Sequence, residues 1–270
     1  MTQQQVRVHV LQVAYGDEED MSVRVERVAA MVRAQAGADL IVLPELWAHG
    51  GFAYPSWSAG AEGLDGHIAR TLSAAARDVG AVLHGGSIVE RASPGAGHGP
   101  EGRGLWNTSL VFGADGELAA SYRKIHRFGF GEGEPRILEA GDQIVTSPLQ
   151  NIQMGLATCY DLRFPELFRQ LVDRGAGLFV IPAAWPKARV EQWRLLGRAR
   201  AIENQAYVVQ CNTAGTHSGV MMGGHSQVIA PDGTVIAEAG DDEEILVVTI
   251  DLGEVGDARE TFPALADRRL

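Results

Sequence analysis

Apolar and polar residues repeat along this chain with two periods, which predict strands and helices in alternation. Residues 6–13 alternate apolar and polar side chains, as in a half-buried strand, whereas residues 21–36 place apolar side chains at helical spacing. The same criteria predict strands at residues 40–43, 81–89, 105–112, 118–122, 152–158, 178–181, 206–211, 226–229 and 245–250, and helices at 68–79, 166–174 and 190–205. We therefore expect one α/β domain over residues 1–270, with two sheets inside and helices outside.

Glycine and proline mark the connections between these elements. Asp115-Gly116 joins two predicted strands in a hairpin, and Pro231-Asp232-Gly233 forms a second turn. Residues 92–104 are rich in Gly and Pro, which indicates a surface loop rather than a linker between domains.

Charge and composition narrow the class of protein. The chain has 46% hydrophobic and 21% charged residues, typical of a globular enzyme, and a net charge of −11, which argues against a nucleic-acid partner. No stretch approaches the roughly 20 apolar residues of a membrane helix. The opening segment MTQQQVRVHVLQV lacks the pattern of a secretory signal. We expect a cytoplasmic protein that binds neither nucleic acid nor membrane.

Two cysteines, Cys159 and Cys211, are expected to be free thiols in a reducing compartment. A free cysteine is more often a small buried residue than a nucleophile. Cys159, however, ends the predicted strand 152–158 and precedes a predicted helix, a turn that can hold a nucleophile out of the sheet. Cys211 lies within a predicted strand, which favours a structural role.

Two further segments carry candidate chemistry. The buried run 40–43 leads directly into Pro44-Glu45, so Glu45 stands at the carboxyl end of a strand, where ligand sites of α/β proteins gather. A carboxylate there can serve as a general base, although an exposed loop glutamate is an equal alternative. Lys124 ends a hairpin strand and can stabilise an oxyanion. A solvated basic edge is the commoner explanation for such a segment.

These segments read LPELW, YRKIH and GLATCYDLRFPELFR, and in this order they resemble the nitrilase, or carbon–nitrogen hydrolase, superfamily. The resemblance continues through PAAWP, RARAIENQAYVV and GHSQVIAPDGTVIAE to about residue 250. It implies a four-layer α-β-β-α sandwich. It also implies a general base at Glu45, an oxyanion-binding cation at Lys124 and a nucleophile at Cys159. An amide would be hydrolysed through a thioester with release of ammonia, and with neither cofactor nor metal.

The resemblance assigns further residues to the site. Members use a second glutamate seven residues before a glycine, and Glu134 lies seven before Gly141, so we choose Glu134 over Glu132. The backbone N–H of Tyr160 is expected to be the second oxyanion donor. The residues expected to bind substrate are Tyr160, Arg163 and Trp185.

The residues after the nucleophile indicate a substrate class. Tyr160-Asp161 with Arg163-Phe164 resembles omega-amidases and deaminated-glutathione amidases, whereas nitrilases typically read C-W-E. We expect a small primary amide, the omega-amide of a dicarboxylic acid. Four cations near the expected site are candidate partners for its carboxylate: Arg127, Arg163, Lys187 and Arg189. For Arg163, an ion pair with Glu166 or with the partner subunit is the alternative.

Other functions remain open at this stage. Within the superfamily they are a deaminated-glutathione-type amidase, a nitrilase, a carbamoyl hydrolase, an acyltransferase and a catalytically silent binding protein. A papain-like enzyme would need a histidine after the cysteine and then an orienting asparagine. It is disfavoured because no asparagine follows Asn212, whereas His217 and His225 come later still. A metallohydrolase is disfavoured because the histidines show no paired ligand spacing.

The resemblance also implies a homodimer or a higher homo-oligomer. Relatives pair through the helices matching residues 166–174 and 190–205, and we expect Phe168, Leu171 and Trp193 to supply the apolar contact. The remaining polar residues of the second helix are expected to form an internal structural network: Arg198, Arg200, Glu203 and Asn204.

Overall fold

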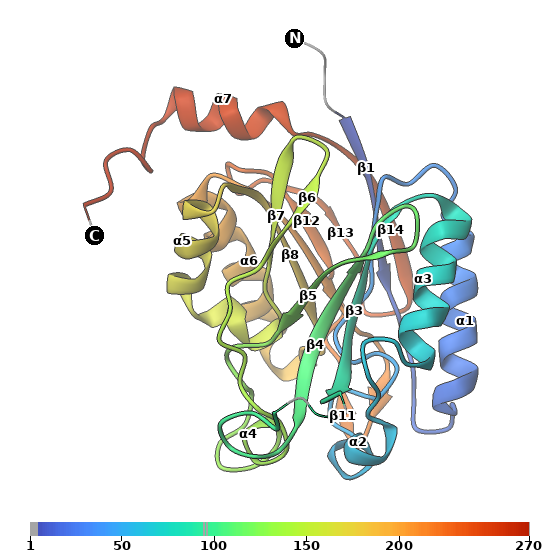
Figure 1. Cartoon of the computed structure of the whole chain (residues 1–270). Coiled ribbons are helices and arrows are strands. Elements are labelled where there is room, and N and C mark those ends of the chain that lie inside the picture. Colours follow the sequence, from blue (N-terminus) through green and yellow to red (C-terminus); the bar gives the residue numbers. More distant parts are fainter. Residues whose placement is uncertain (1–4, 94, 96, 270) are drawn as a thin grey trace.

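Two six-stranded sheets pack face to face in the computed structural model, which describes residues 5–93, 95 and 97–269 (Figure 1). The spatial order of the first sheet is β14 (Glu244–Asp251), β1 (Gln5–Gln12), β2 (Leu40–Val42), β3 (Val82–Arg91), β4 (Leu105–Phe112) and β5 (Leu118–Arg123). The order of the second is β13 (Val235–Glu238), β12 (Gln227–Ile229), β9 (Tyr207–Asn212), β8 (Ala176–Ala183), β7 (Ile152–Leu156) and β6 (Thr146–Leu149). A small hairpin joins β10 (Thr216–His217) to β11 (Val220–Met221).

Helices cover the two outer faces. The first sheet is covered by α1 (Met21–Arg33) and α3 (His67–Val79), and the second by α5 (Pro165–Asp173) and α6 (Val190–Asn204) (Figure 1). Four shorter elements lie in the connections: α2 (Tyr54–Gly60), α4 (Glu134–Ile137), η1 (Cys159–Arg163) and η2 (Lys187–Arg189). Helix α7 (Gly253–Thr261) follows β14, at the end of the molecule opposite α2 and α4.

Three apolar layers hold this arrangement together. Alternation along β1 turns Val6, Val8 and Val10 toward the second sheet, where they join a core with residues of β7, β8 and β9. Leu11 belongs instead to the core beneath α1 and α3. A third core lies between the second sheet and α5 and α6. The expected four-layer α-β-β-α sandwich is confirmed.

The predicted elements are present with small shifts at their ends, but several short elements were not predicted. Helix α1 ends at Arg33, three residues early, and the chain then turns through Gly37 at φ +77°. β6 was missed because it is a four-residue edge strand that contains Pro148. β13 and α7 also went unpredicted, since neither shows a clear apolar period. Of the loop 92–104, residues 94 and 96 lie outside the described residues, as do residues 1–4 of the opening segment.

The three residues that we expected to form the apolar contact between subunits were wrong. Phe168, Leu171 and Trp193 are fully buried within this chain, in the core beneath α5 and α6, and cannot supply an exposed apolar surface. The large apolar side chains that α6 exposes are Leu195 and Ile202.

The polar network of α6 is present for three of its four predicted members. Arg200 donates to the carbonyl of Leu162 and pairs with Glu203 at 2.7 Å, and Asn204 donates to the carbonyl of Arg200. Arg198 is exposed and donates elsewhere, to the carbonyl of Gly233. In the described part of the chain, no helix combines the length and apolar character needed to span a membrane.

Candidate active site

The predicted catalytic residues meet at one edge of the sandwich. Glu45 and Lys124 follow the ends of β2 and β5 in the first sheet, and Cys159 follows the end of β7 in the second sheet. β2 and β3 run parallel, and β4 is antiparallel to both β3 and β5. β2 and β5 therefore run in the same direction, and their carboxyl ends lie at the same edge of the sheet. The topology therefore places side chains from both sheets around one point.

A close approach of the segment after β2 to strand β3 positions Glu45. Gly86 has φ +68°, and a Cβ atom at this position would lie 1.9 Å from the carbonyl oxygen of Pro44. Only glycine fits there, which allows the segment after β2 to lie directly against β3. The N–H of Leu46 donates to Ser87 Oγ at 3.1 Å, and the N–H of Ala184 donates to Glu45 Oε2 at 2.8 Å. The Glu45 carboxylate is thus held by both sheets.

Lys124 and Asn107 each donate to two carboxylates. Lys124 Nζ lies 2.7 Å from Glu45 Oε1 and 3.0 Å from Glu134 Oε1. Asn107 Nδ2 lies 2.8 Å from the same two oxygen atoms. Glu134 is buried at the start of α4, whereas Glu132 is exposed, so the structure brings Glu134 and not Glu132 to the site.

Burial and charge shift the ionisation of this cluster. Burial by itself would lower the pKa of Lys124, but the charges of Glu134 and Glu45 outweigh it and hold that pKa well above its usual value. Burial raises the pKa of Glu134, and the ammonium of Lys124 opposes the shift. Lys124 therefore carries a fixed positive charge between two carboxyl groups.

Cys159 lies at a tight elbow between β7 and η1. Its backbone has φ +49°, a left-handed conformation that is unfavourable for a residue with a side chain. The buried carboxylate of Asp161 supports the elbow by accepting hydrogen bonds from the N–H of Thr158 at 2.8 Å and from Tyr122 Oη at 2.7 Å. It also accepts from the N–H of His126 at 3.0 Å.

The two thiols differ in their surroundings. Burial raises the pKa of the Cys159 thiol well above its usual value, the charge of Glu45 raises it further, and Lys124 opposes the shift. Cys159 is therefore a neutral thiol at rest and needs a base before it can attack. Cys211 is fully buried in the core between the sheets, and its thiol donates toward the carbonyl of Leu11 at 3.3 Å.

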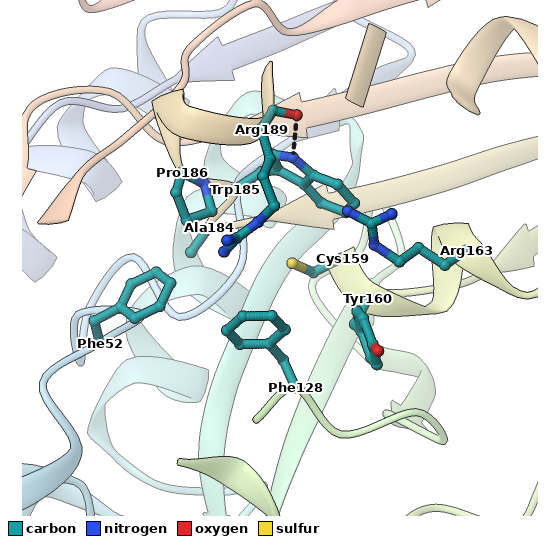
Figure 2. Close-up of a pocket in the computed structure, with 9 residues that line it drawn as sticks. All are labelled: Phe52, Phe128, Cys159, Tyr160, Arg163, Ala184, Trp185, Pro186 and Arg189. Atoms are coloured by element: carbon teal, nitrogen blue, oxygen red, sulfur yellow. Dashed lines mark hydrogen bonds between the residues drawn. The ribbon is translucent and has the colours of Figure 1, made fainter. Parts of the chain in front are cut away.

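A small pocket opens beside Cys159. Figure 2 shows the sulfur of Cys159 facing the space that the labelled side chains enclose. The pocket is lined by Phe52, Phe128, Cys159, Tyr160, Arg163, Ala184, Trp185, Pro186 and Arg189. The structure thus brings the three predicted substrate-binding residues into one pocket with Cys159.

The four candidate cations have different partners. Arg127 pairs with Glu101 at 2.8 Å, and Lys187 pairs with Asp241. Arg163 donates to the amide oxygen of Gln192, and its guanidinium lies 4.9 Å from the centre of the Trp185 ring. Arg163 therefore does not pair with Glu166, the alternative partner that its position in the sequence suggested.

Arg189 is the fourth of these cations. Within the described ranges its guanidinium has no carboxylate partner, and it lies 5.4 Å from the centre of the Phe128 ring. Of the two arginines that line the pocket, Arg163 donates a side-chain hydrogen bond, whereas Arg189 has none within the described ranges.

Two residues of the site were missed by the sequence analysis. Asn107 lies in β4, where Asn107, Thr108 and Ser109 interrupt an otherwise apolar and fully buried strand, and this polar interruption was a usable signal. Asp161 offered a weaker signal, because an aspartate three residues after Thr158 matches a capping pattern. Within the residues described, no group of three or more His, Cys, Asp or Glu side chains is arranged to hold a metal ion.

Comparison with known proteins agrees with the geometry. The model of the carbon-nitrogen hydrolase family matches residues 7–260. The 2-oxoglutaramate amidase of Paenarthrobacter nicotinovorans is 44% identical over 269 residues, covering 98% of this chain and 90% of the relative. The omega-amidase NIT2 of Homo sapiens is 34% identical over 257 residues, covering 91% of this chain and 89% of the relative.

A solved structure also matches over nearly the whole chain. Nit3 of Saccharomyces cerevisiae, described as a member of branch 10 of the nitrilase superfamily, superimposes with a TM-score of 0.86 at 30% sequence identity. The match covers 99% of this chain and 97% of that protein.

Proposed function

The chain belongs to the carbon–nitrogen hydrolase family and is a cysteine-dependent amide hydrolase, and we propose that its substrate is the omega-amide of a 2-oxo dicarboxylic acid. The observation that carries this proposal is the pocket, in which Cys159 lies between two arginine side chains and beside the cluster of Glu45, Lys124 and Glu134. A relative 44% identical to this chain is named for 2-oxoglutaramate, an amide of this kind.

The first half of the reaction acylates the enzyme. Glu45 accepts hydrogen bonds from Lys124, Asn107 and the N–H of Ala184, so it is held as an acceptor and can take the thiol proton of Cys159. The sulfur then attacks the amide carbon. Lys124 has three N–H donors, of which two bind Glu45 and Glu134, and the third is directed to the oxyanion with the backbone N–H of Tyr160.

Ammonia leaves after Glu45 returns the proton to the amide nitrogen, and a thioester on Cys159 remains. Water then gives a proton to Glu45 and attacks the thioester carbon. As the carbon–sulfur bond breaks and the dicarboxylic acid leaves, Glu45 returns that proton to the sulfur of Cys159. Glu134 positions Lys124 throughout, because both of its carboxylate oxygens lie 3.0 Å from Nζ. The raised pKa of Cys159 supports this order of events, since a neutral thiol requires a base at the moment of attack.

A comparison of two amides of equal length tests the substrate class. The omega-amide of a 2-oxo dicarboxylic acid should exceed a neutral aliphatic amide by at least about 10-fold in kcat/KM, because a carboxylate beside a guanidinium is worth more than about 1.4 kcal/mol. Ammonia release measures both. Equal rates, or a preference for the neutral amide, a nitrile or a carbamoyl compound, would reject the substrate proposal.

The same assay tests the nucleophile. Cys159→Ala should abolish ammonia release from every amide, since no thioester can form. Cys211→Ser is the matched control, because this thiol lies in the core and a hydroxyl can keep its hydrogen bond to Leu11; most activity should remain. Turnover by the Cys159 variant would exclude the mechanism whatever the substrate.

We also propose that the enzyme is cytoplasmic and forms a homodimer or a larger homo-oligomer. A mechanism that depends on a reduced thiol at Cys159 suits a reducing compartment. Leu195 and Ile202 are 66% and 52% exposed on α6, one of the two helices that the sequence resemblance assigns to the subunit contact, and burial of these side chains would favour association.

A further inference from the structure

We infer that Arg189 is the specificity-determining residue that binds the far carboxylate of the amide substrate. The inference rests on the proposed function, and it adds which cation of the chain selects an acidic amide. The sequence expectation assigned substrate binding to Tyr160, Arg163 and Trp185, and it left the carboxylate partner open among four cations that included Arg189.

The first argument is the disposition of charge around the pocket. Lys124 is already bound by Glu45 and Glu134, and Arg127 and Lys187 are each neutralised by a carboxylate outside the pocket lining. An anionic substrate that enters beside the buried carboxyl groups needs positive charge that is not yet paired. Arg189 supplies it, since its guanidinium has no carboxylate partner in the described part of the chain.

The second argument compares Arg189 with Arg163 on the opposite side of Cys159. Arg163 donates to Gln192 and lies over the Trp185 ring, so part of its hydrogen-bonding capacity is already used within the protein. In the part of the chain that the structure describes, the Arg189 side chain makes no hydrogen bond or ion pair, and its guanidinium lies over the face of the Phe128 ring. Five N–H donors in a planar fork therefore remain for a ligand, and a carboxylate matches that geometry with two parallel hydrogen bonds.

The third argument is that the backbone of Arg189 is fixed. Its N–H donates to the carbonyl of Pro186 at 3.0 Å, and its carbonyl accepts from the indole N–H of Trp185 at 2.8 Å. The preceding turn is held in place by Asn212, whose side chain bonds both the N–H and the carbonyl of Trp185. A guanidinium carried on a fixed backbone loses less conformational freedom on binding.

The position of the side chain agrees with this role. Figure 2 shows the guanidinium of Arg189 extending toward the space that the sulfur of Cys159 faces, with Ala184 and Phe128 nearby. Because the pocket is small, a short substrate whose amide carbon contacts Cys159 has its far end among the remaining lining residues. We therefore expect a substrate of four or five carbon atoms to direct its carboxylate toward Arg189, which lines the same pocket.

The test is Arg189→Met, with Lys187→Met as the matched control. Both changes remove one cation from η2, but Lys187 pairs with Asp241 and does not line the pocket. Arg189→Met should lower kcat/KM for the acidic amide by at least about 10-fold, mainly through KM, and should change the neutral amide less than about 3-fold. Lys187→Met should leave both amides within about 3-fold of wild type.

A binding measurement separates recognition from catalysis. In the Cys159→Ala protein, Arg189→Met should weaken the Kd for the dicarboxylate product at least about 10-fold, and Lys187→Met should not. If the wild-type enzyme shows no preference for the acidic amide, both the substrate proposal and this inference are rejected. A wild-type preference that Arg189→Met retains overturns the inference alone, as does an equal loss on both amides. If Arg163→Met removes the preference while Arg189→Met keeps it, the carboxylate belongs to Arg163.

Discussion

Lys124 and Asn107 allow two carboxyl groups to occupy one buried site. Both side chains donate to Glu45 and to Glu134, at distances between 2.7 and 3.0 Å, and all four side chains are almost completely buried. Two carboxylates this close repel each other in a medium of low dielectric constant unless donors lie between them. Lys124, which offsets this repulsion, is also the cation that we propose to stabilise the oxyanion.

Lys124→Met is expected to lower kcat by at least about 10²-fold, because one fixed oxyanion donor contributes about that much to the rate. The measurement is ammonia release under saturating amide, with circular dichroism to establish that the variant is folded. Lys187→Met provides the comparison, since this lysine pairs with Asp241 and does not line the pocket. A folded Lys124→Met enzyme with kcat within tenfold of wild type would contradict the role assigned to this ammonium group.

At the scale of the element, α6 has two chemically different sides. Trp193 and Ala201 are buried against the second sheet, whereas Leu195 and Ile202 are exposed. Leu195 and Ile202 are seven residues apart, or two turns, and therefore lie on one face of the helix. A helix that leaves two large apolar side chains in line on its outer face is typical of an element that packs against another protein surface.

The double variant Leu195→Glu with Ile202→Glu should dissociate the assembly, because charges would replace the apolar side chains at the proposed contact. Analytical ultracentrifugation at micromolar concentration measures the molar mass directly. Val23→Glu is the control, since Val23 is 58% exposed on α1, the helix of the opposite layer. Wild-type protein that sediments at the 28.9 kDa of one chain, or a double variant with unchanged mass, would contradict the proposed dimer.

At the scale of the whole molecule, buried histidines make folding sensitive to acid. Burial lowers the pKa of His49, His84 and His217 to about 4 in each case. His84 is fully buried, and its Nδ1 accepts a hydrogen bond from the N–H of Gly86 at 3.3 Å. In the unfolded chain a histidine takes up a proton near pH 6.5, whereas the folded protein resists protonation until about pH 4. The resulting stability is complete above about pH 6.5 and is lost as the pH falls toward 4.

His84→Leu should therefore make the free energy of unfolding less dependent on pH. From pH 7 to pH 5 the wild-type value should fall by about 2 kcal/mol more than that of the variant, as the difference between the two pKa values requires. Urea unfolding at the two pH values measures both. His67→Leu serves as the control because the His67 side chain is 56% exposed, and it should keep the wild-type dependence. Parallel losses in wild type and His84→Leu would show that His84 is not a source of the acid sensitivity.

The sequence by itself determined the main elements, the layered α/β architecture and the family. Apolar periods of two and of about 3.6 residues report which face of a strand or helix is buried, and this information is local. The strand-end positions of Glu45, Lys124 and Cys159 were also readable, since each lies within two residues of the end of a predicted strand. Short elements whose apolar residues show no regular spacing, such as β6 and α7, could not be recognised in this way.

Only the tertiary structure decided which side chains are paired. Arg127, Lys187, Arg163 and Arg189 are equivalent cations in the sequence, and they differ because Glu101, Asp241 and Gln192 come to the first three from distant parts of the chain. The same reason accounts for Phe168 and Trp193, whose apolar character is evident but whose burial depends on the packing of α5 and α6 onto a sheet. A side chain's chemistry is local, whereas its partners and its burial are set by contacts between segments far apart in the chain.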